Sequence, residues 1–346
     1  MRPVFIHNDN IITSLGFSTR EVVQAVGTGT TGILTYEDPV LHPHPVSLSR
    51  VDTARLDEAF DGLLATKGKT HPSGSFTRLE KMFLLSMHDA LQGAPFAPGD
   101  PGVLPVISTT KGNIDLLEDR FKVAFPHKRL YLWEMARIIA TFFGFRNTPL
   151  VVSNACISGV MALMVASRYI RAGRFDHAVV AGGDIVSEFV VSGFQSFQAM
   201  SPEPCKPFDR DRTGLSLGEG CGTIILSAFP GGEKGELPQV AGAATTNDAN
   251  HISGPSRTGH ELGDAINEAM RQATITPENL GYISAHGTAT PFNDEMESKA
   301  FEYSGLTEIP VNSFKGYWGH TLGAAGIIES AAALSSMRNG MLYRSV

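Results

Sequence analysis

The sequence has few cysteines, no excess of basic residues and no long apolar run. Its 346 residues include three cysteines and 28 lysines and arginines against 35 acidic residues, giving a net charge of -7. The acidic balance argues against a general nucleic-acid or membrane-surface binder, because such proteins need a basic face. Neither an apolar stretch of about 18 residues nor a signal-peptide pattern is found, so we expect no membrane insertion and a cytoplasmic location.

The three cysteines, Cys156, Cys205 and Cys221, show no Cys-x-x-Cys spacing. An odd number of cysteines without metal-ligand spacing predicts neither a disulfide framework nor a zinc site. The rest of the composition, 42% hydrophobic and 18% charged, is that of an ordinary globular protein. The length suits one large domain or two halves packed together.

Short apolar runs alternate with helical patterns, which predicts an α/β fold with largely buried sheets. We expect strands at 3–7, 103–108, 148–153, 177–182, 222–227, 238–244, 279–285 and 309–313. We expect helices at 19–27, 77–92, 113–124, 130–143, 158–172, 260–273, 293–303 and 322–338.

Two parts of the chain share this layout. Strands 148–153 and 309–313 lead through Cys156 and His320, respectively, into helices that begin with small residues. This favours a duplicated βα unit, with residues 1–230 as the first half and 231–346 as the second, although chance likeness between generic βα units is the alternative. The second half shows no counterpart of the first half's later strands, so we expect it to lack its last strands.

Cys156 and two histidines are candidates for chemistry. A thiol at a helix N-terminus meets free backbone N–H groups and the positive end of the helix dipole, which favour the thiolate, although free cysteines are also commonly buried and inert. His286 and His320 each follow a predicted strand, at the edge where α/β sheets place their sites. A structural role is the alternative for each histidine, but equivalent turns favour one shared site with Cys156.

The sequence gives weaker support for a metal site or a dinucleotide-binding loop. No His-x-x-x-His or His-Glu-x-x-His pair anchors a metal, so we expect no metal site. The glycine-rich run at 218–222 leads into a strand-like segment rather than a helix, so we expect a bend beside packed strands and not a dinucleotide loop. The charged stretch at 209–212 is typical of a solvated turn.

Four ordered motifs resemble those of the elongating, two-histidine β-ketoacyl-acyl carrier protein synthases of the thiolase-like superfamily. They are Asn-Ala-Cys-Ile-Ser-Gly at 154–159, Pro-Phe-Asp-Arg-Asp-Arg-Thr-Gly at 207–214 with Gly-Glu-Gly at 218–220, His-Gly-Thr-Ala-Thr-Pro-Phe-Asn-Asp at 286–294, and Lys-Gly-Tyr-Trp-Gly-His-Thr-Leu-Gly-Ala-Ala-Gly at 315–326. The likeness covers roughly residues 150–335 and extends weakly to 10–16. It implies a thiolase-like fold of two duplicated βα halves in α-β-α-β-α layers, usually as a homodimer.

The resemblance also implies the chemistry. Cys156 would accept an acyl group from a thioester, and His286 and His320 would hydrogen-bond the thioester oxygen of a malonyl-acyl carrier protein as it loses CO2. Lys315 would support the histidines electrostatically and Glu297 would help order the site. Thr288 and Thr290 match positions that bind phosphopantetheine, which the carrier protein brings, so the chain would need no cofactor of its own.

Several points stay open in the sequence. A non-catalytic subunit that sets chain length in a heterodimer and a coenzyme A-dependent thiolase-like acyltransferase are the alternative functions. Relatives carry a glycine-rich run where this chain has Lys111, and they continue beyond Val346 with a Gly-Phe-Gly-Gly loop. The basic residues Arg120, Lys122, Lys128 and Arg129 are candidates for docking an acidic carrier protein, with a solvated helix face as the other interpretation.

Overall fold

A five-stranded sheet lies at the centre of the first half of the chain. The computed structural model describes residues 2–68, 73–119, 124–231, 237–249, 254 and 256–346. The strand order is β1 (Phe5–Ile12), β8 (Gly220–Ser227), β6 (His177–Asp184), β4 (Val103–Ser108) and β5 (Leu150–Val152). β6, β4 and β5 are parallel, whereas β8 is antiparallel to both β1 and β6. Every residue of β4 and β8 is buried, as expected for strands covered on both faces.

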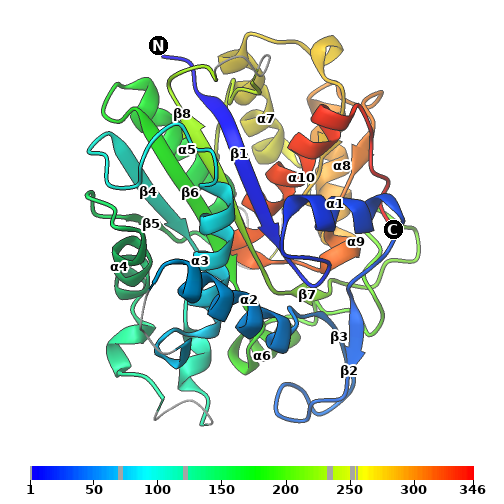
Figure 1. Ribbon diagram of the computed structural model, residues 1–346. Coiled ribbons are helices and arrows are strands. Elements are labelled where there is room, and N and C mark those ends of the chain that lie inside the picture. The colour runs from blue at the N-terminus through cyan, green and yellow to red at the C-terminus, as the bar shows by residue number, and fades with distance from the viewer. Residues whose placement is uncertain (1, 69–72, 120–123, 232–236, 250–253, 255) are drawn as a thin grey trace.

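Helices cover both faces of this sheet and separate it from a second, smaller one (Figure 1). On one face lie α2 (Thr53–Thr66), α3 (Arg78–Ala90) and α4 (Leu132–Phe143). The other face carries α5 (Ser158–Arg171) and α10 (Ala325–Asn339), with α1 (Thr19–Gly27) against β1 and α10. Beyond α10, β9 (Ile283–Ser284) and β10 (Val311–Asn312) pair in parallel, and α7 (His260–Ala273) and α8 (Pro291–Tyr303) pack with them. The layers are therefore α-β-α-β-α.

The two halves repeat one order of elements. The first runs α3, β4, α4, β5, α5 and the second runs α7, β9, α8, β10, α10, with a parallel strand pair in each. The predicted fold of two similar βα halves is confirmed. The division of the chain at residue 230 stays a prediction.

Three predicted elements differ from the structure. Residues 238–244 form no strand: they touch β1 through one Phe5–Gln239 bridge and then turn toward α7, where a Cβ on Gly242 would clash with the Ala269 oxygen. The helix predicted at 113–124 is a 3-10 turn over Ile114–Leu117 among the described residues, and the Asn113 side-chain oxygen accepts from the Thr77 hydroxyl instead of capping a helix. The strand predicted at 279–285 is shortened to β9 by a preceding 3-10 turn at Pro277–Asn279.

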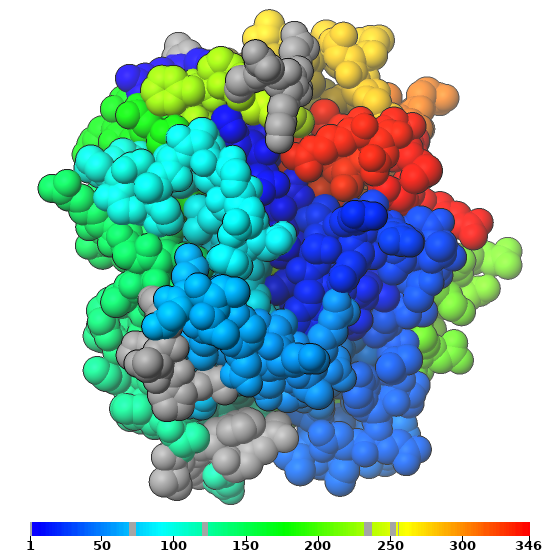
Figure 2. All heavy atoms as spheres, viewed as in Figure 1, coloured from blue at the N-terminus to red at the C-terminus, as the bar shows by residue number. Residues whose placement is uncertain are grey.

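Several elements were not predicted. These are α2, α6 (Glu188–Ser196), α9 (Lys315–Trp318) and a small sheet of β2 (Leu34–Tyr36), β3 (Val46–Ser49) and β7 (Leu217–Gly218). On the face shown in Figure 2, the N-terminal part of the chain lies between α3 and the C-terminal residues, and the Arg338–Asp9 ion pair links these two ends. Among the described residues, no helix has both the length and the apolar character needed to span a bilayer.

Helices α5 and α10 approach each other closely at two glycines, Gly159 and Gly326. A Cβ on Gly159 would lie 2.9 Å from the Ile327 backbone nitrogen, and one on Gly326 would lie 2.6 Å from the Val160 nitrogen. Ala162 and Ala166 of α5 are fully buried, while Val160 is 43% exposed. The small residues at these positions therefore let the start of α5 reach the start of α10.

Candidate active site

Cys156 lies on a strained turn between β5 and α5. Ala155 has a φ of 46°, a left-handed conformation that costs free energy outside glycine. The Ser158 hydroxyl closes the turn, because it donates to the Ala155 oxygen and accepts from the Asn154 N–H, both at 2.7 Å. The thiol is thereby placed just before the first turn of α5.

His286 lies in the turn after β9, and a buried carboxylate fixes its backbone. The Glu297 carboxylate accepts hydrogen bonds from the backbone N–H groups of His286, at 2.8 Å, and Gly287, at 2.6 Å. The Ser313 hydroxyl donates to the Gly287 oxygen at 3.0 Å from the neighbouring strand end. Burial raises the pKa of Glu297 to about 7, while these N–H donors act in the opposite direction.

His320 lies between α9 and the helical turn that precedes α10. Its backbone pairs with β7: the His320 N–H donates to Ser216 and the Gly218 N–H donates to the His320 oxygen. A Cβ on Gly218 would clash with the Trp318 oxygen, so the glycine at this position serves close backbone packing. The run at 218–222 lies in β7 and β8, where we expected a bend beside packed strands. The backbone N–H of Leu322, itself at a φ of 53°, donates to His320 Nδ1 at 3.3 Å.

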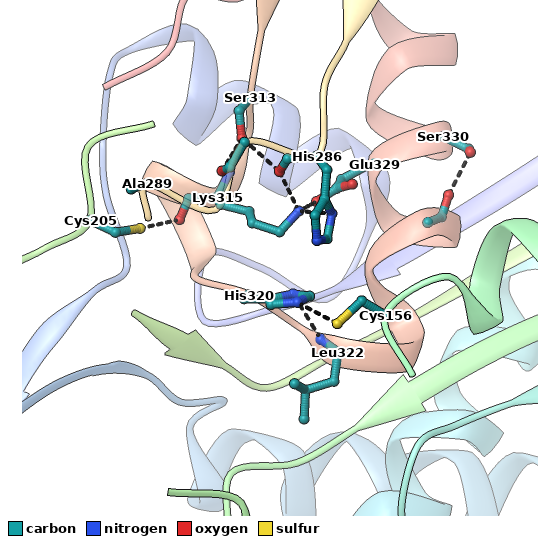
Figure 3. Close-up of polar contacts among 12 residues, drawn as sticks. Cys156, Cys205, His286, Ala289, Ser313, Lys315, His320, Leu322, Glu329 and Ser330 are labelled. Atoms are coloured by element: carbon teal, nitrogen blue, oxygen red, sulfur yellow. Dashed lines mark hydrogen bonds and ion pairs between the residues drawn. The ribbon is translucent and has the colours of Figure 1, made fainter. Parts of the chain in front are cut away.

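The three turns bring Cys156, His286 and His320 together (Figure 3). His320 Nε2 lies 3.0 Å from Cys156 Sγ. The two imidazole rings are 5.0 Å apart between centroids and cross at 84°. The three residues predicted from separate motifs therefore form one cluster in the structure.

Lys315 stands behind His286 with all three of its donors used. Its Nζ lies 3.0 Å from His286 Nδ1, 2.6 Å from the His286 oxygen and 2.5 Å from Glu329 Oε1. An ammonium has three N–H donors and no acceptor, so His286 Nδ1 must accept. Glu329 was missed in the sequence, where its only signal is a single acid in the otherwise uncharged first part of α10.

These contacts fix the tautomer of both histidines. Nδ1 accepts a hydrogen bond in each ring, from Lys315 in His286 and from the Leu322 backbone in His320, so the neutral rings carry their proton on Nε2. Burial, and then the charge of Lys315, lower the pKa of His286 and of His320 well below the usual range. Both imidazoles are therefore neutral Nε2–H donors at neutral pH.

Burial raises the pKa of the Cys156 thiol, and the charge of Lys315 opposes that shift. The sequence-based expectation considered only the helix N-terminus, which favours the thiolate. In the folded protein desolvation is the larger influence, so the resting form at neutral pH is the thiol with the His320 N–H directed at its sulfur.

Cys156, His286 and His320 are also, among the described residues, a group whose side chains could together hold a metal ion. The ligand atoms of Cys156, His286 and His320 lie within 4.8 Å of one another. The Lys315 ammonium contacts His286 on the side away from the cluster and disfavours a cation there by like-charge repulsion. That the chain uses no metal stays a prediction.

The remaining predicted residues lie around this cluster or away from it. The Thr288 and Thr290 hydroxyls are 3.0 Å apart in the segment that follows His286. Arg129 is tied to buried Glu80 and is therefore part of an internal ion pair, whereas Lys128 is exposed and lies 3.3 Å from Glu134. Arg120 and Lys122 lie outside the described residues.

Two family models match the chain. The model of the beta-ketoacyl synthase N-terminal domain matches residues 59–228, and that of the beta-ketoacyl synthase C-terminal domain matches residues 237–346. The chain is 31% identical over 222 residues to the chloroplastic 3-oxoacyl-[acyl-carrier-protein] synthase I of Hordeum vulgare, covering 60% of this chain and 48% of that protein. It is 34% identical over 221 residues to the tetracenomycin polyketide synthase ketoacyl synthase alpha subunit of Streptomyces glaucescens, covering 60% and 52%. The chain thus spans about half the length of these curated relatives.

Solved structures share the fold along almost the whole chain. The ketosynthase ApeO of Xenorhabdus doucetiae, solved with its chain length factor ApeC, matches with a TM-score of 0.81 at 26% identity, over 97% of this chain and 85% of that one. The ishigamide ketosynthase/chain length factor matches with a TM-score of 0.84 at 23% identity, over 98% and 87%. The fold is thiolase-like, and the chain belongs to the beta-ketoacyl synthase family.

Proposed function

We propose that the chain catalyses the decarboxylating Claisen condensation of an acyl thioester with malonyl-acyl carrier protein. The product would be a β-ketoacyl-acyl carrier protein for fatty acid, polyene or polyketide-type synthesis. One observation carries the proposal: two neutral histidines whose Nδ1 atoms are occupied lie beside a cysteine, with His320 Nε2 3.0 Å from its sulfur. This cluster offers one nucleophile and two N–H donors, which are the groups that the reaction needs.

In the first half-reaction Cys156 accepts the acyl group. Its sulfur attacks the thioester carbonyl and forms the new C–S bond, the old C–S bond breaks, and the thiol proton of Cys156 ends on the departing phosphopantetheine sulfur. The first turn of a helix leaves backbone N–H groups without intrahelical partners, and such groups at the start of α5 are suited to the oxyanion that forms on the carbonyl. The hydrogen bond from His320 holds the sulfur at the N-terminus of α5.

In the second half-reaction the malonyl thioester loses CO2. The electron pair of the breaking C–C bond passes into an enolate, whose oxygen would accept hydrogen bonds from Nε2–H of His286 and His320. The enolate carbon then attacks the acyl-cysteine carbonyl, and the Cys156 sulfur leaves as thiolate. Each preorganised donor contributes on the order of 3 kcal/mol to the transition state.

Lys315, Glu329 and Glu297 would act through the histidines. Lys315 holds the tautomer of His286, Glu329 balances the buried ammonium, and Glu297 fixes the His286 backbone. Thr288 and Thr290, close to His286 in the chain, would hydrogen-bond the phosphopantetheine arm. We therefore propose that the chain needs no metal or redox cofactor of its own.

We propose an acyl carrier protein as the partner and a homodimer as the working assembly, in the cytoplasm. The relative AntDE was solved with the acyl-carrier protein AntF, and ApeO with a chain length factor, which makes a heterodimer the alternative. Light scattering of the purified chain, alone and after co-expression with a candidate subunit, distinguishes the two assemblies.

Cys156 argues against a non-catalytic subunit, and the second histidine argues against a thiolase-like enzyme. A non-catalytic subunit has no use for a cysteine placed on a strained turn against His320, and a coenzyme A-dependent thiolase-like enzyme needs no second neutral histidine for decarboxylation. Free acetyl-CoA condensed without a malonyl donor would favour the thiolase-like alternative.

The test is incubation of the protein with acyl- and malonyl-carrier proteins, with CO2 and the β-ketoacyl product measured together. The proposal predicts one CO2 per product, loss of product in Cys156→Ala and continued malonyl decarboxylation in that variant. Cys221→Ala is the matched control, because Cys221 is fully buried in β8. Neither condensation nor decarboxylation by the wild-type protein would contradict the proposal.

A further inference from the structure

We infer that Asp184 is a positioning residue that holds the Cys156 turn and the His320 turn in register. This inference rests on the proposed roles of Cys156 and His320, but Asp184 itself lies outside the four sequence motifs. Asp184 is the last residue of β6 and is 1% exposed. Its carboxylate lies where the two halves of the molecule meet.

On one side, Asp184 binds the segment that follows β4. Oδ1 accepts from the Thr109 hydroxyl at 2.8 Å, and Oδ2 accepts from the Thr110 N–H at 2.9 Å. This segment is joined to the Cys156 turn: the Thr109 N–H donates to Val152, the last residue of β5, and the Ser153 hydroxyl donates to Thr110 at 3.4 Å. Asp184 is therefore linked to the chain three residues before the nucleophile.

On the other side, the same carboxylate binds the second half. Oδ2 accepts from the Gly323 N–H at 2.7 Å, and the Gly323 oxygen accepts from the Ser108 hydroxyl at 3.1 Å. The adjacent residue, Leu322, is the one whose N–H donates to His320 Nδ1. Glycine is required here, because a Cβ on residue 323 would lie 2.8 Å from Asp184 Oδ2. Asp184 thus fixes the peptide directly after the one whose N–H sets the His320 tautomer.

Uncharged donors hold this buried carboxylate. Burial raises the pKa of Asp184, and the hydrogen bonds from Thr110, Thr109 and Gly323 oppose that shift. A carboxylate in this position costs desolvation free energy, and a simple packing role could be filled by an apolar residue. Its ability to accept from both halves at once is the property that an apolar side chain lacks.

The test is a double-mutant cycle between Asp184→Asn and His320→Ala. Cys156 alkylation by iodoacetamide is followed against pH by peptide mass spectrometry in the four proteins. The groups that face the Cys156 sulfur are His320, His286, Lys315, Asp184 and Glu329, so removing the Asp184 charge alone lowers the thiol pKa in every background. If Asp184 also positions His320, replacing Asp184 weakens the hydrogen bond from His320 to the sulfur. That loss raises the pKa of the Cys156 thiol, and it can occur only where His320 is present.

We therefore expect the Asp184→Asn shift in the alkylation pKa to differ by about half a unit or more between the protein that keeps His320 and the His320→Ala variant. Equal shifts in the two backgrounds would overturn the inference. Malonyl decarboxylation provides a second readout: Asp184→Asn should lower kcat about tenfold with His320 present and leave the His320→Ala protein unchanged. Should the wild-type protein decarboxylate nothing, the proposed function fails, while the alkylation cycle still decides the role of Asp184.

Two further variants keep the test decisive if Asp184→Asn folds poorly. Thr109→Val removes one donor to Asp184 and keeps the carboxylate, so we expect a smaller coupling of the same sign. Asp9→Asn is the matched control: Asp9 is also buried and accepts from the Thr19 hydroxyl at 2.8 Å, but it lies against α1 and Arg338. It should leave the Cys156 alkylation profile unchanged, and a coupling equal to that of Asp184 would count against the inference.

Discussion

His320 Nε2 lies 3.0 Å from Cys156 Sγ, although 164 positions separate the two residues in the chain. The contact joins a turn of the first βα half to the equivalent turn of the second. Each half therefore carries part of one cluster, and neither half contains both Cys156 and His320. A single shared site explains why both turns are strained, at Ala155 and at Leu322.

Loss of either histidine should slow malonyl decarboxylation. Each Nε2–H donor directed at the enolate oxygen contributes about 3 kcal/mol, so His286→Ala and His320→Ala should each lower kcat by roughly 10²-fold. The measurement is CO2 release from malonyl-carrier protein in the Cys156→Ala background, where condensation cannot interfere. His260→Ala is the control, since His260, at the start of α7, packs on Tyr303 of α8. Full decarboxylation by both active-site variants would contradict the two-donor mechanism.

The buried histidines should make folding stability fall at acidic pH. The pKa of each is lowered by burial and by Lys315, so the unfolded chain takes up protons below about pH 6.5 while the folded chain does not. Each histidine then removes up to about 1.4 kcal/mol of the free energy of unfolding per pH unit.

Glu297 acts in the opposite sense. Burial raises its pKa to about 7, so it contributes stability that is present at low pH and is lost as pH rises to that value.

Urea unfolding of the wild type and of a His286→Asn/His320→Asn double variant between pH 5 and 8 isolates the contribution of the histidines. The variant should show a weaker loss toward pH 5, and parallel curves would show that the histidines are not buried in the neutral form.

Gly159→Ala should destabilise the junction of α5 and α10. The added Cβ would lie 2.9 Å from the Ile327 nitrogen, and overpacking against backbone typically costs about 1–3 kcal/mol. Gly62→Ala is the control: a Cβ there has no atom within 4 Å, and replacing a helical glycine gains roughly 0.5–1 kcal/mol. The midpoint temperature of thermal unfolding should therefore fall for Gly159→Ala and rise for Gly62→Ala. Equal stability of Gly159→Ala and wild type would argue against the close approach of these helices.

Lys315 and Glu329 should behave as a coupled buried pair. Their side chains are 0% and 12% exposed, and their charged atoms are 2.5 Å apart. Removing one partner leaves the other charge buried, so Lys315→Met or Glu329→Gln should cost about 3–5 kcal/mol, and the double variant should cost less than the sum. Chemical denaturation of the four proteins measures the coupling, and additive losses would exclude it.

The motifs predicted which residues cluster better than periodicity predicted the elements around them. Cys156, His286 and His320 were recognisable because each follows a strand in a turn rich in small residues. Glu329 and Asp184 were not, because their roles depend on contacts with Lys315 and Gly323 that only the folded chain brings together. The strand expected at 238–244 failed for the same reason: its pattern is apolar, but Gly242 packs on the backbone of α7.

The proposed mechanism depends above all on Cys156 as the acceptor of the acyl group. Its most direct test is peptide mass spectrometry of the wild-type protein after exposure to an acyl-carrier protein, followed by addition of malonyl-carrier protein. We expect an acyl adduct on the peptide containing Cys156, none on those containing Cys205 or Cys221, and loss of the adduct as β-ketoacyl product forms. An unmodified Cys156, or an adduct that malonyl-carrier protein leaves in place, would contradict it.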